Sequence, residues 1–145
     1  MTAYDPSVRR ALPLILVALA LAACGGKVAP KATTSTAAPT GHVRVVIVGQ
    51  DHHPLVGKRW HYEVRVTVNG KPVTAFIHLQ FLFGGSPVGE VGKHTVKNGV
   101  WQETFGTPGH PPFPAAAAGQ QLVLAAFVKV KGYPPAKAGW PVVPQ

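Results

Sequence analysis

The chain of 145 residues is poor in several groups that particular functions require. Its one cysteine, Cys24, excludes an intrachain disulfide and any metal site built from several cysteines. Only five residues are Asp or Glu, so the acids and bases that an enzyme must bring together are scarce. The uncharged run from Ala11 to Ala23 is too short to span a bilayer, which takes about 20 helical residues.

What the chain does contain is enough apolar material for a core and many turn-forming residues. Hydrophobic residues make up 46% of the sequence, which argues against a wholly disordered chain. Glycine (16) and proline (15) are both abundant and indicate frequent turns. The length suits one domain with accessory segments.

The N-terminal residues have the three parts of an export signal. Arg9 and Arg10 form a basic pair, the apolar run follows, and small residues precede Cys24. Leu21-Ala22-Ala23-Cys24 resembles the lipobox of bacterial lipoproteins. The resemblance implies that residues 1–23 are a cleaved signal peptide and that Cys24 carries a lipid. It places the protein outside the cytoplasm, anchored to the cell membrane through Cys24. The alternative is an ordinary signal peptide with an incidental cysteine.

Residues 24–41 combine this cysteine with a linker of Gly, Ala, Thr, Pro and Lys. The linker has no apolar periodicity and no large hydrophobic side chain to bury. Burial therefore cannot offset the entropy of ordering it, and the composition predicts a flexible, disordered tether.

Residues 42–145 carry the patterns of β-strands. The clearest is 60–68, where apolar and polar residues alternate so that Tyr62, Val64 and Val66 share one face. Asn-Gly pairs at 69–70 and 98–99 indicate two-residue hairpin turns, because both residues tolerate positive φ. The strands expected are 43–48, 60–68, 73–83, 87–91, 94–97 with 100–105, 122–131 and 139–143.

The same alternation predicts which side chains point inward. In 73–83 and in 122–131 the inward residues are Val73, Ala75, Ile77, Leu79, Phe81 and Phe83, and Leu122, Leu124, Ala126, Val128 and Val130. Short strands with turn signals about every 8–12 residues predict an all-β fold, an immunoglobulin-like β-sandwich of about seven strands. Pro141 lacks an N–H, so the last strand is expected at an edge if it forms.

Three short motifs carry a resemblance to a known group of domains. They are Trp60-x-Tyr62-x-Val64-x-Val66, Gly70-Lys71-Pro72-Val73 and Phe83-Gly84-Gly85. Together they resemble the immunoglobulin-like domains of secreted proteins and lipoproteins of high-GC Gram-positive bacteria. The resemblance covers about residues 43–143 and implies fold and export, but no activity.

The net charge and the lack of catalytic motifs limit the classes of function that the chain could have. Without residues 1–23 the chain has 12 Lys+Arg against 4 Asp+Glu, a formal charge of +8. A basic domain near a membrane is attracted to anionic headgroups or envelope polymers. Nucleic acid is not expected, because the compartment is wrong and basic runs are missing. No catalytic motif occurs, so we expect no enzyme and no cofactor.

The seven histidines offer the one alternative to a plain binding domain. If the Asn69-Gly70 turn joins 60–68 to 73–83 as a hairpin, His61 lies directly opposite His78, and Glu63 opposite Phe76. Two adjacent imidazoles can share Zn²⁺ or Cu²⁺. A third ligand could come from His94 or a loop histidine.

Three apolar residues fall on the polar faces of their strands: Phe76, Leu82 and Phe127. They predict either a patch that docks a partner or residues covered by a loop. The function expected is a lipid-anchored envelope protein with a non-catalytic binding or scaffolding domain. Its partners would be the membrane, through the lipid, and anionic envelope polymers or another envelope protein. The alternative is a metal-binding envelope protein that uses His61 and His78.

Overall fold

The computed structural model describes residues 40–145. The predicted signal peptide, Cys24 and nearly all of the predicted linker lie outside the described residues. Within them the chain forms eight strands and a single 3₁₀ turn, Ala115–Ala117. No helix between residues 40 and 145 is long and apolar enough to cross a membrane.

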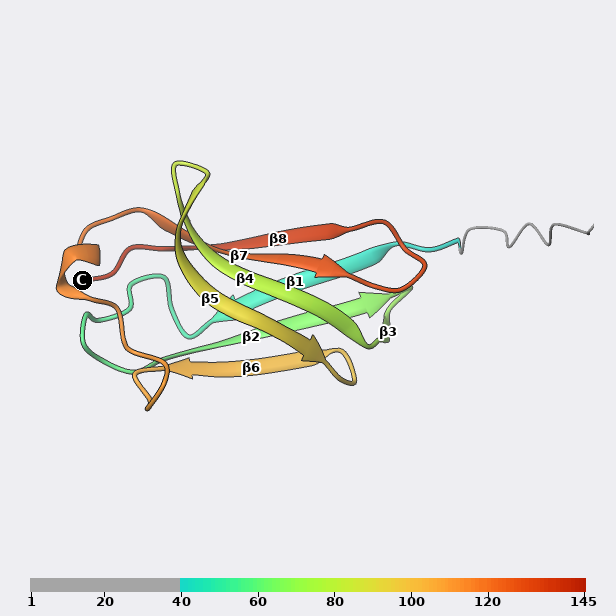
Figure 1. The fold of residues 1–145 in the computed structure, drawn as a ribbon, viewed down its shortest axis with the longest axis horizontal. Helices are drawn as coiled ribbons and strands as arrows, with labels where there is room; N and C mark the ends of the chain where they lie inside the picture. Colours follow the sequence, from blue (N-terminus) through green and yellow to red (C-terminus); the bar gives the residue numbers. More distant parts are fainter. Residues whose placement is uncertain (1–39) are drawn as a thin grey trace, which may run out of the picture. The chain divides into compact units, whose positions relative to one another are not determined.

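The strands form two antiparallel sheets (Figure 1). In the first sheet β2 is central, with β1 along one edge and both β6 and β3 along the other. The second sheet has the order β5-β4-β7-β8. This is the arrangement of an immunoglobulin-like sandwich, and the predicted fold class is confirmed. The bounds are β1 Val43–Gly49, β2 Trp60–Val68, β3 Lys71–Pro72, β4 Ala75–Phe83, β5 Ser86–Val96, β6 Val100–Phe105, β7 Leu122–Lys129 and β8 Ala136–Val142.

Both predicted Asn-Gly turns are present. Asn69, Gly70, Asn98 and Gly99 all have positive φ, between 50° and 78°. This conformation matches the twist of a two-residue hairpin, which is why Asn and Gly occupy it. The turns join β2 to β3 and β5 to β6.

The predicted phase of the core strands is confirmed for β2 and β7. Tyr62, Val64 and Val66 are fully buried on β2, and every predicted inward residue of β7 is buried. On β4 the phase holds through Leu79 but changes near the hairpin tip, where Leu82 is 6% exposed and Phe83 is 49% exposed. The β4–β5 register shifts between Phe81 and Leu82, so the expectations that Phe83 points inward and that Leu82 lies on the polar face are wrong.

Only the turn of the predicted hairpin between 60–68 and 73–83 is present. The predicted pairing of the two strands is wrong. Of residues 71–83, only Lys71 and Pro72 pair with β2, and β4 begins at Ala75 in the other sheet. Pro72 has no N–H to extend the ladder, and β6 occupies the rest of that edge of β2. Because β4 crosses to the facing sheet, its apolar face packs against the apolar face of β2.

The bounds of β5 and β8 also differ from the predicted strands. Residues 87–91 and 94–96 belong to one long strand, β5, which ends one residue before Lys97, and the last strand starts at Ala136 rather than at Gly139. β8 is an edge strand, as Pro141 requires.

Candidate functional site

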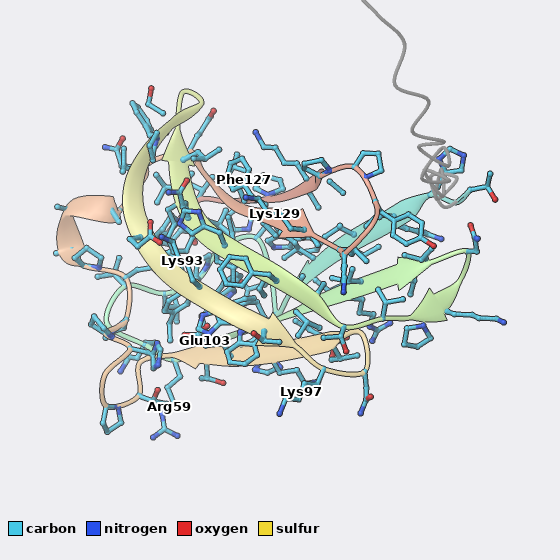
Figure 2. The ribbon with its side chains drawn as sticks, turned by 45° about the vertical axis from the view of Figure 1, so that its right-hand side comes forward. Arg59, Lys93, Lys97, Glu103, Phe127 and Lys129 are labelled. Carbon is cyan, nitrogen blue, oxygen red and sulfur yellow. The ribbon has the colours of Figure 1, made fainter. Side chains whose placement is uncertain are left out.

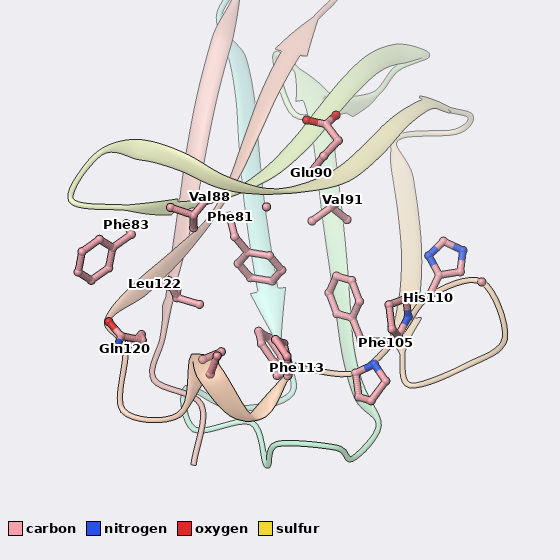
Figure 3. A pocket seen from close by; sticks show the side chains of 17 residues that line it. Phe81, Phe83, Val88, Glu90, Val91, Phe105, His110, Phe113, Gln120 and Leu122 are labelled. Carbon is pink, nitrogen blue, oxygen red and sulfur yellow. The ribbon is translucent and has the colours of Figure 1, made fainter.

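A pocket of about 620 Å³ opens at the end of the sandwich, between the β4–β5 hairpin and the segment 106–121 (Figure 3). We call it the β4–β5 pocket. Its walls are mainly aromatic, aliphatic and proline side chains, with His110 and Gln120 as polar side chains. Glu90 also borders the pocket, but its carboxylate contacts His78 and Gln80 on the outer face of the sheet. The apolar lining residues are Phe81, Phe83, Val88, Val91, Phe105, Pro111, Pro112, Phe113, Pro114, Ala116, Ala117 and Leu122.

Two β-bulges in β5 shape this pocket. Leu79 pairs with Gly92 and Gln80 with Glu90, which leaves Val91 without a partner on β4. The second shift leaves Val88 unpaired in the same way. Bulges bend a strand and increase its twist. The hairpin therefore twists away from the first sheet at its tip (Figure 1), and both bulged valines line the pocket.

Aromatic rings form the base of the pocket. Phe81 lies 5.7 Å from Phe105 and 5.3 Å from Phe113, measured between ring centroids. Trp60 packs behind them, 5.7 Å from Phe113, and is 1% exposed. Such pairs gain about 0.5–1.5 kcal/mol beyond area burial, which gives the pocket a firm inner wall.

A buried carboxylate lies beside the pocket. Glu103 is 9% exposed and points inward from β6, in the phase of Trp101 and Phe105. The Tyr62 hydroxyl donates to Glu103 Oε2 at 2.5 Å, and Trp101 Nε1–H donates to the same oxygen at 3.3 Å. These donors offset part of the cost of removing the carboxylate from water.

Two histidines complete what we call the Glu103 cluster (Tyr62, His94, Trp101, Glu103 and His110). His110 Nδ1 lies 2.5 Å from Glu103 Oε1, and His94 Nε2 lies 3.7 Å from Oε2. Neither contact is a hydrogen bond, and the His94 contact is too long to be one. His94 Nε2 and Glu103 Oε1 are therefore buried without a hydrogen-bond partner among the described residues. Both contacts become ion pairs when the imidazoles are protonated.

The cluster joins three parts of the fold. His94 comes from β5, at the edge of the second sheet, and stacks on Trp101 of β6 with ring centroids 4.0 Å apart. His110 belongs to the segment 106–121 and also lines the β4–β5 pocket. Its contact with Glu103 therefore ties the wall of the pocket to the first sheet.

Burial changes the acidity of the tyrosine in this cluster. Loss of solvent, followed by the hydrogen bond to Glu103, raises the pKa of Tyr62 well above its ordinary value. The hydroxyl consequently remains a proton donor to Glu103 across the physiological pH range.

The predicted pairing of His61 with His78 is wrong. The two residues lie in different sheets: His61 on β2 is opposite Thr104, and its Nδ1 lies 3.0 Å from Thr104 Oγ1. His78 on β4 is opposite Lys93 and Phe127, and its Nε2 contacts Glu90 Oε1 at 2.5 Å. The reason is the crossing of the chain after Pro72, which also separates Glu63 from Phe76.

His94 and Cys24 were the other predicted site residues. No group of three or more His, Cys, Asp or Glu between residues 40 and 145 has a geometry that could hold a metal ion. His94, predicted as a possible third ligand, lies in the Glu103 cluster instead. The predicted lipidation residue, Cys24, is outside the described residues.

Sequence reasoning missed the pocket and the role of Glu103. One signal was available, since Glu103 stands between Trp101 and Phe105 in an alternating strand, where an inward acid is out of place. Nothing local in the sequence indicated that His94 and His110 would converge on it.

No known protein-family model matches the sequence, and no curated protein resembles it significantly.

Proposed function

We propose that this chain is a lipid-anchored cell-envelope protein whose immunoglobulin-like domain is a non-catalytic binding module. The β4–β5 pocket is its binding site. An apolar ligand, or an apolar part of a larger partner, would occupy the pocket, with His110 and Gln120 orienting it.

The observation that carries this proposal is the pocket itself. Its volume of about 620 Å³ lies within the range of ligand pockets, about 300–1,000 Å³. Its chemistry also fits, because ligand sites combine mostly apolar walls with a few polar groups. Two bulges and an exposed Phe83 are features that a strand built only for packing would not need.

The arrangement around Glu103 supports binding rather than catalysis. A catalytic triad built on the His110–Glu103 pair would need a nucleophile beside it. Among the described residues that line the pocket, none is Ser, Thr or Cys. In this proposal the pair holds the wall of the pocket in place.

The proposed anchor rests on the sequence. The basic pair, the short apolar run and the lipobox-like residues before Cys24 together support export and lipidation. The linker that follows would let the domain stand off the membrane and reach a partner.

Photolabelling tests the pocket in the protein as it occurs in membranes. The probe is a long-chain alcohol with a diazirine, and mass spectrometry locates the labelled residues. We expect labels to concentrate in residues 81–91 and 105–122. Val88→Glu places a charge at the pocket and should lower this labelling about tenfold, since an apolar ligand would then desolvate a carboxylate.

Leu55→Glu is the matched control, because Leu55 is as exposed as Val88 (57% against 59%) but does not line the pocket. It should leave the labelling unchanged. Equal labelling of both variants, or labels spread evenly over the domain, would contradict the proposal.

A further inference from the structure

The outer face of the second sheet carries a concentration of positive charge that the pocket does not use. His78 on β4 is opposite Lys93 of β5 on one side and Phe127 of β7 on the other, and Phe127 is opposite Lys137 of β8. In the next row Phe76 is opposite Lys129. We call this surface the basic face; its residues are Phe76, His78, Lys93, Phe127, Lys129 and Lys137.

The three lysines of the basic face are exposed and span the sheet from edge to edge. Figure 2 shows Lys93 on β5 and Lys129 on β7, on either side of β4. Lys97 and Lys131 follow β5 and β7 in the same phase and extend the positive surface at the ends of these strands.

Negative charge is nearly missing from this surface. Of the four carboxylates among residues 40–145, only Glu90 lies on the outer face of this sheet, and His78 and Gln80 both contact it. Glu103 is buried, and Glu63 belongs to the first sheet, where it pairs with Arg65. No lysine of the basic face forms an ion pair with a carboxylate among the described residues, and Glu90 interacts with Lys93 only through longer-range attraction.

Two aromatic rings lie among these lysines. Phe76 is 44% exposed, although it could have been a polar residue at no cost to the core. Phe127 is half-buried, with Lys137 Nζ 5.1 Å above its ring centroid. A surface with lysines for phosphate groups and exposed aromatic rings for the acyl boundary is what an anionic membrane interface attracts.

The point where the described chain begins lies close to this surface. Gly41 is beside Tyr133, in the turn that follows Lys131. Cys24 stands 17 positions before Gly41, and the flexible linker that the composition predicts between them would span about 20 Å on average. A membrane-held N-terminus would thus keep the basic face at a high effective concentration near the bilayer.

We infer that the basic face docks on an anionic phospholipid bilayer. Each lysine near such a surface contributes about a fivefold gain in affinity, and the attraction weakens as salt shortens the Debye length. Docking places the second sheet against the membrane and leaves the first sheet facing away from it. The inference goes beyond the proposed pocket and does not depend on it.

Lysine footprinting of the full chain in vesicles tests this inference. The protein is reconstituted into vesicles of phosphatidylcholine alone or with phosphatidylglycerol, and an amine-reactive reagent is read out by mass spectrometry. In the anionic vesicles we expect modification of Lys93, Lys129 and Lys137 to slow about fivefold. Lys58 and Lys71, which lie off the basic face, should keep their rates, and 1 M salt should abolish the difference.

Paired charge reversals supply the matched control. Lys129→Glu with Lys137→Glu should abolish the protection of Lys93, since two lost contacts weaken docking about 25-fold. Arg44→Glu with Lys71→Glu changes the net charge equally but on the first sheet, and should leave that protection intact.

The outcomes separate this inference from the proposed anchor. Failure of the chain to associate with neutral vesicles would contradict the anchor alone. Equal protection of all lysines in anionic vesicles, or none, would overturn docking through the basic face. Protection of the same lysines by soluble polyphosphate but not by anionic vesicles would overturn it in favour of a soluble polyanion.

Discussion

At the scale of single residues, Glu103 is the feature that departs furthest from the rules of a sandwich core. It occupies an inward position on β6, where an apolar side chain would normally pack. The Tyr62 and Trp101 donors hold one carboxylate oxygen, and His110 approaches the other. Removing any of these partners leaves the buried carboxylate of Glu103 with fewer compensating groups. The free energy of unfolding should then fall.

Tyr62→Phe tests this balance. At neutral pH we expect the free energy of unfolding to fall by about 1–3 kcal/mol, because Glu103 loses its closest donor. Tyr133→Phe is the control, since Tyr133 lies in the turn after β7 and makes no contact with Glu103. Urea unfolding of the three proteins gives the comparison.

The same variant also changes the pH dependence of stability. The raised pKa of Tyr62 means that the folded chain keeps a proton that the unfolded chain releases above about pH 10. Stability is therefore complete below that pH and falls as the pH rises further. Tyr62→Phe should flatten this decline between pH 9 and about pH 11, and an unchanged slope would contradict the assignment to Tyr62.

At the scale of elements, two turns of the same type have different surroundings. Gly70 and Gly99 both have positive φ after an Asn, but a Cβ on Gly70 would meet nothing within 4 Å. A Cβ on Gly99 would lie 2.7 Å from Pro72 Cβ and 2.7 Å from the Val66 carbonyl oxygen. Gly99 in the β5–β6 turn is thus packed against β3, whereas Gly70 in the β2–β3 turn faces open space.

Alanine substitutions should reveal this difference. Gly70→Ala should cost about 1 kcal/mol, from the left-handed backbone alone. Gly99→Ala should cost about 3 kcal/mol, because strain and a backbone clash add. Thermal unfolding of both variants measures the two costs, and equal losses would show that the turn does not pack against Pro72 as described.

At the scale of the whole molecule, the proposed architecture joins a membrane anchor to a sandwich with two distinct surfaces. The β4–β5 pocket lies at one end, and the basic face covers the outer side of the second sheet. Membrane docking through the basic face would leave the β4–β5 pocket available to a partner. Docking in turn requires that the chain is held at the membrane. The anchor on Cys24 is therefore the first element to test.

Cys24→Ala should abolish incorporation of an alkyne-tagged fatty acid in cells, because the thiol that accepts the lipid is gone. The tag is detected on the protein after conjugation to a fluorophore. Thr33→Ala, in the predicted linker, is the control and should be labelled like the parent. Labelling that persists in Cys24→Ala, or a parent without label, would rule out the lipid anchor at this position.

Local pattern in the sequence determined the parts of this fold that depend on neighbouring residues. Alternation gave the inward phase of β2 and β7, and Asn69-Gly70 and Asn98-Gly99 gave both tight turns, because side-chain period and positive φ are local properties. The sandwich class follows from the same spacing of strands and turns.

Partners distant in the sequence were decided only by the tertiary structure. The predicted pairing of His61 with His78 was wrong because Pro72 ends the ladder and β6 takes the remaining edge of β2, which no local pattern reveals. The approach of His94 and His110 to Glu103 likewise depends on which edges of the two sheets meet. Several long-range strand pairings fit the local sequence about equally well. The pairing that forms is the one that buries the apolar faces of both sheets.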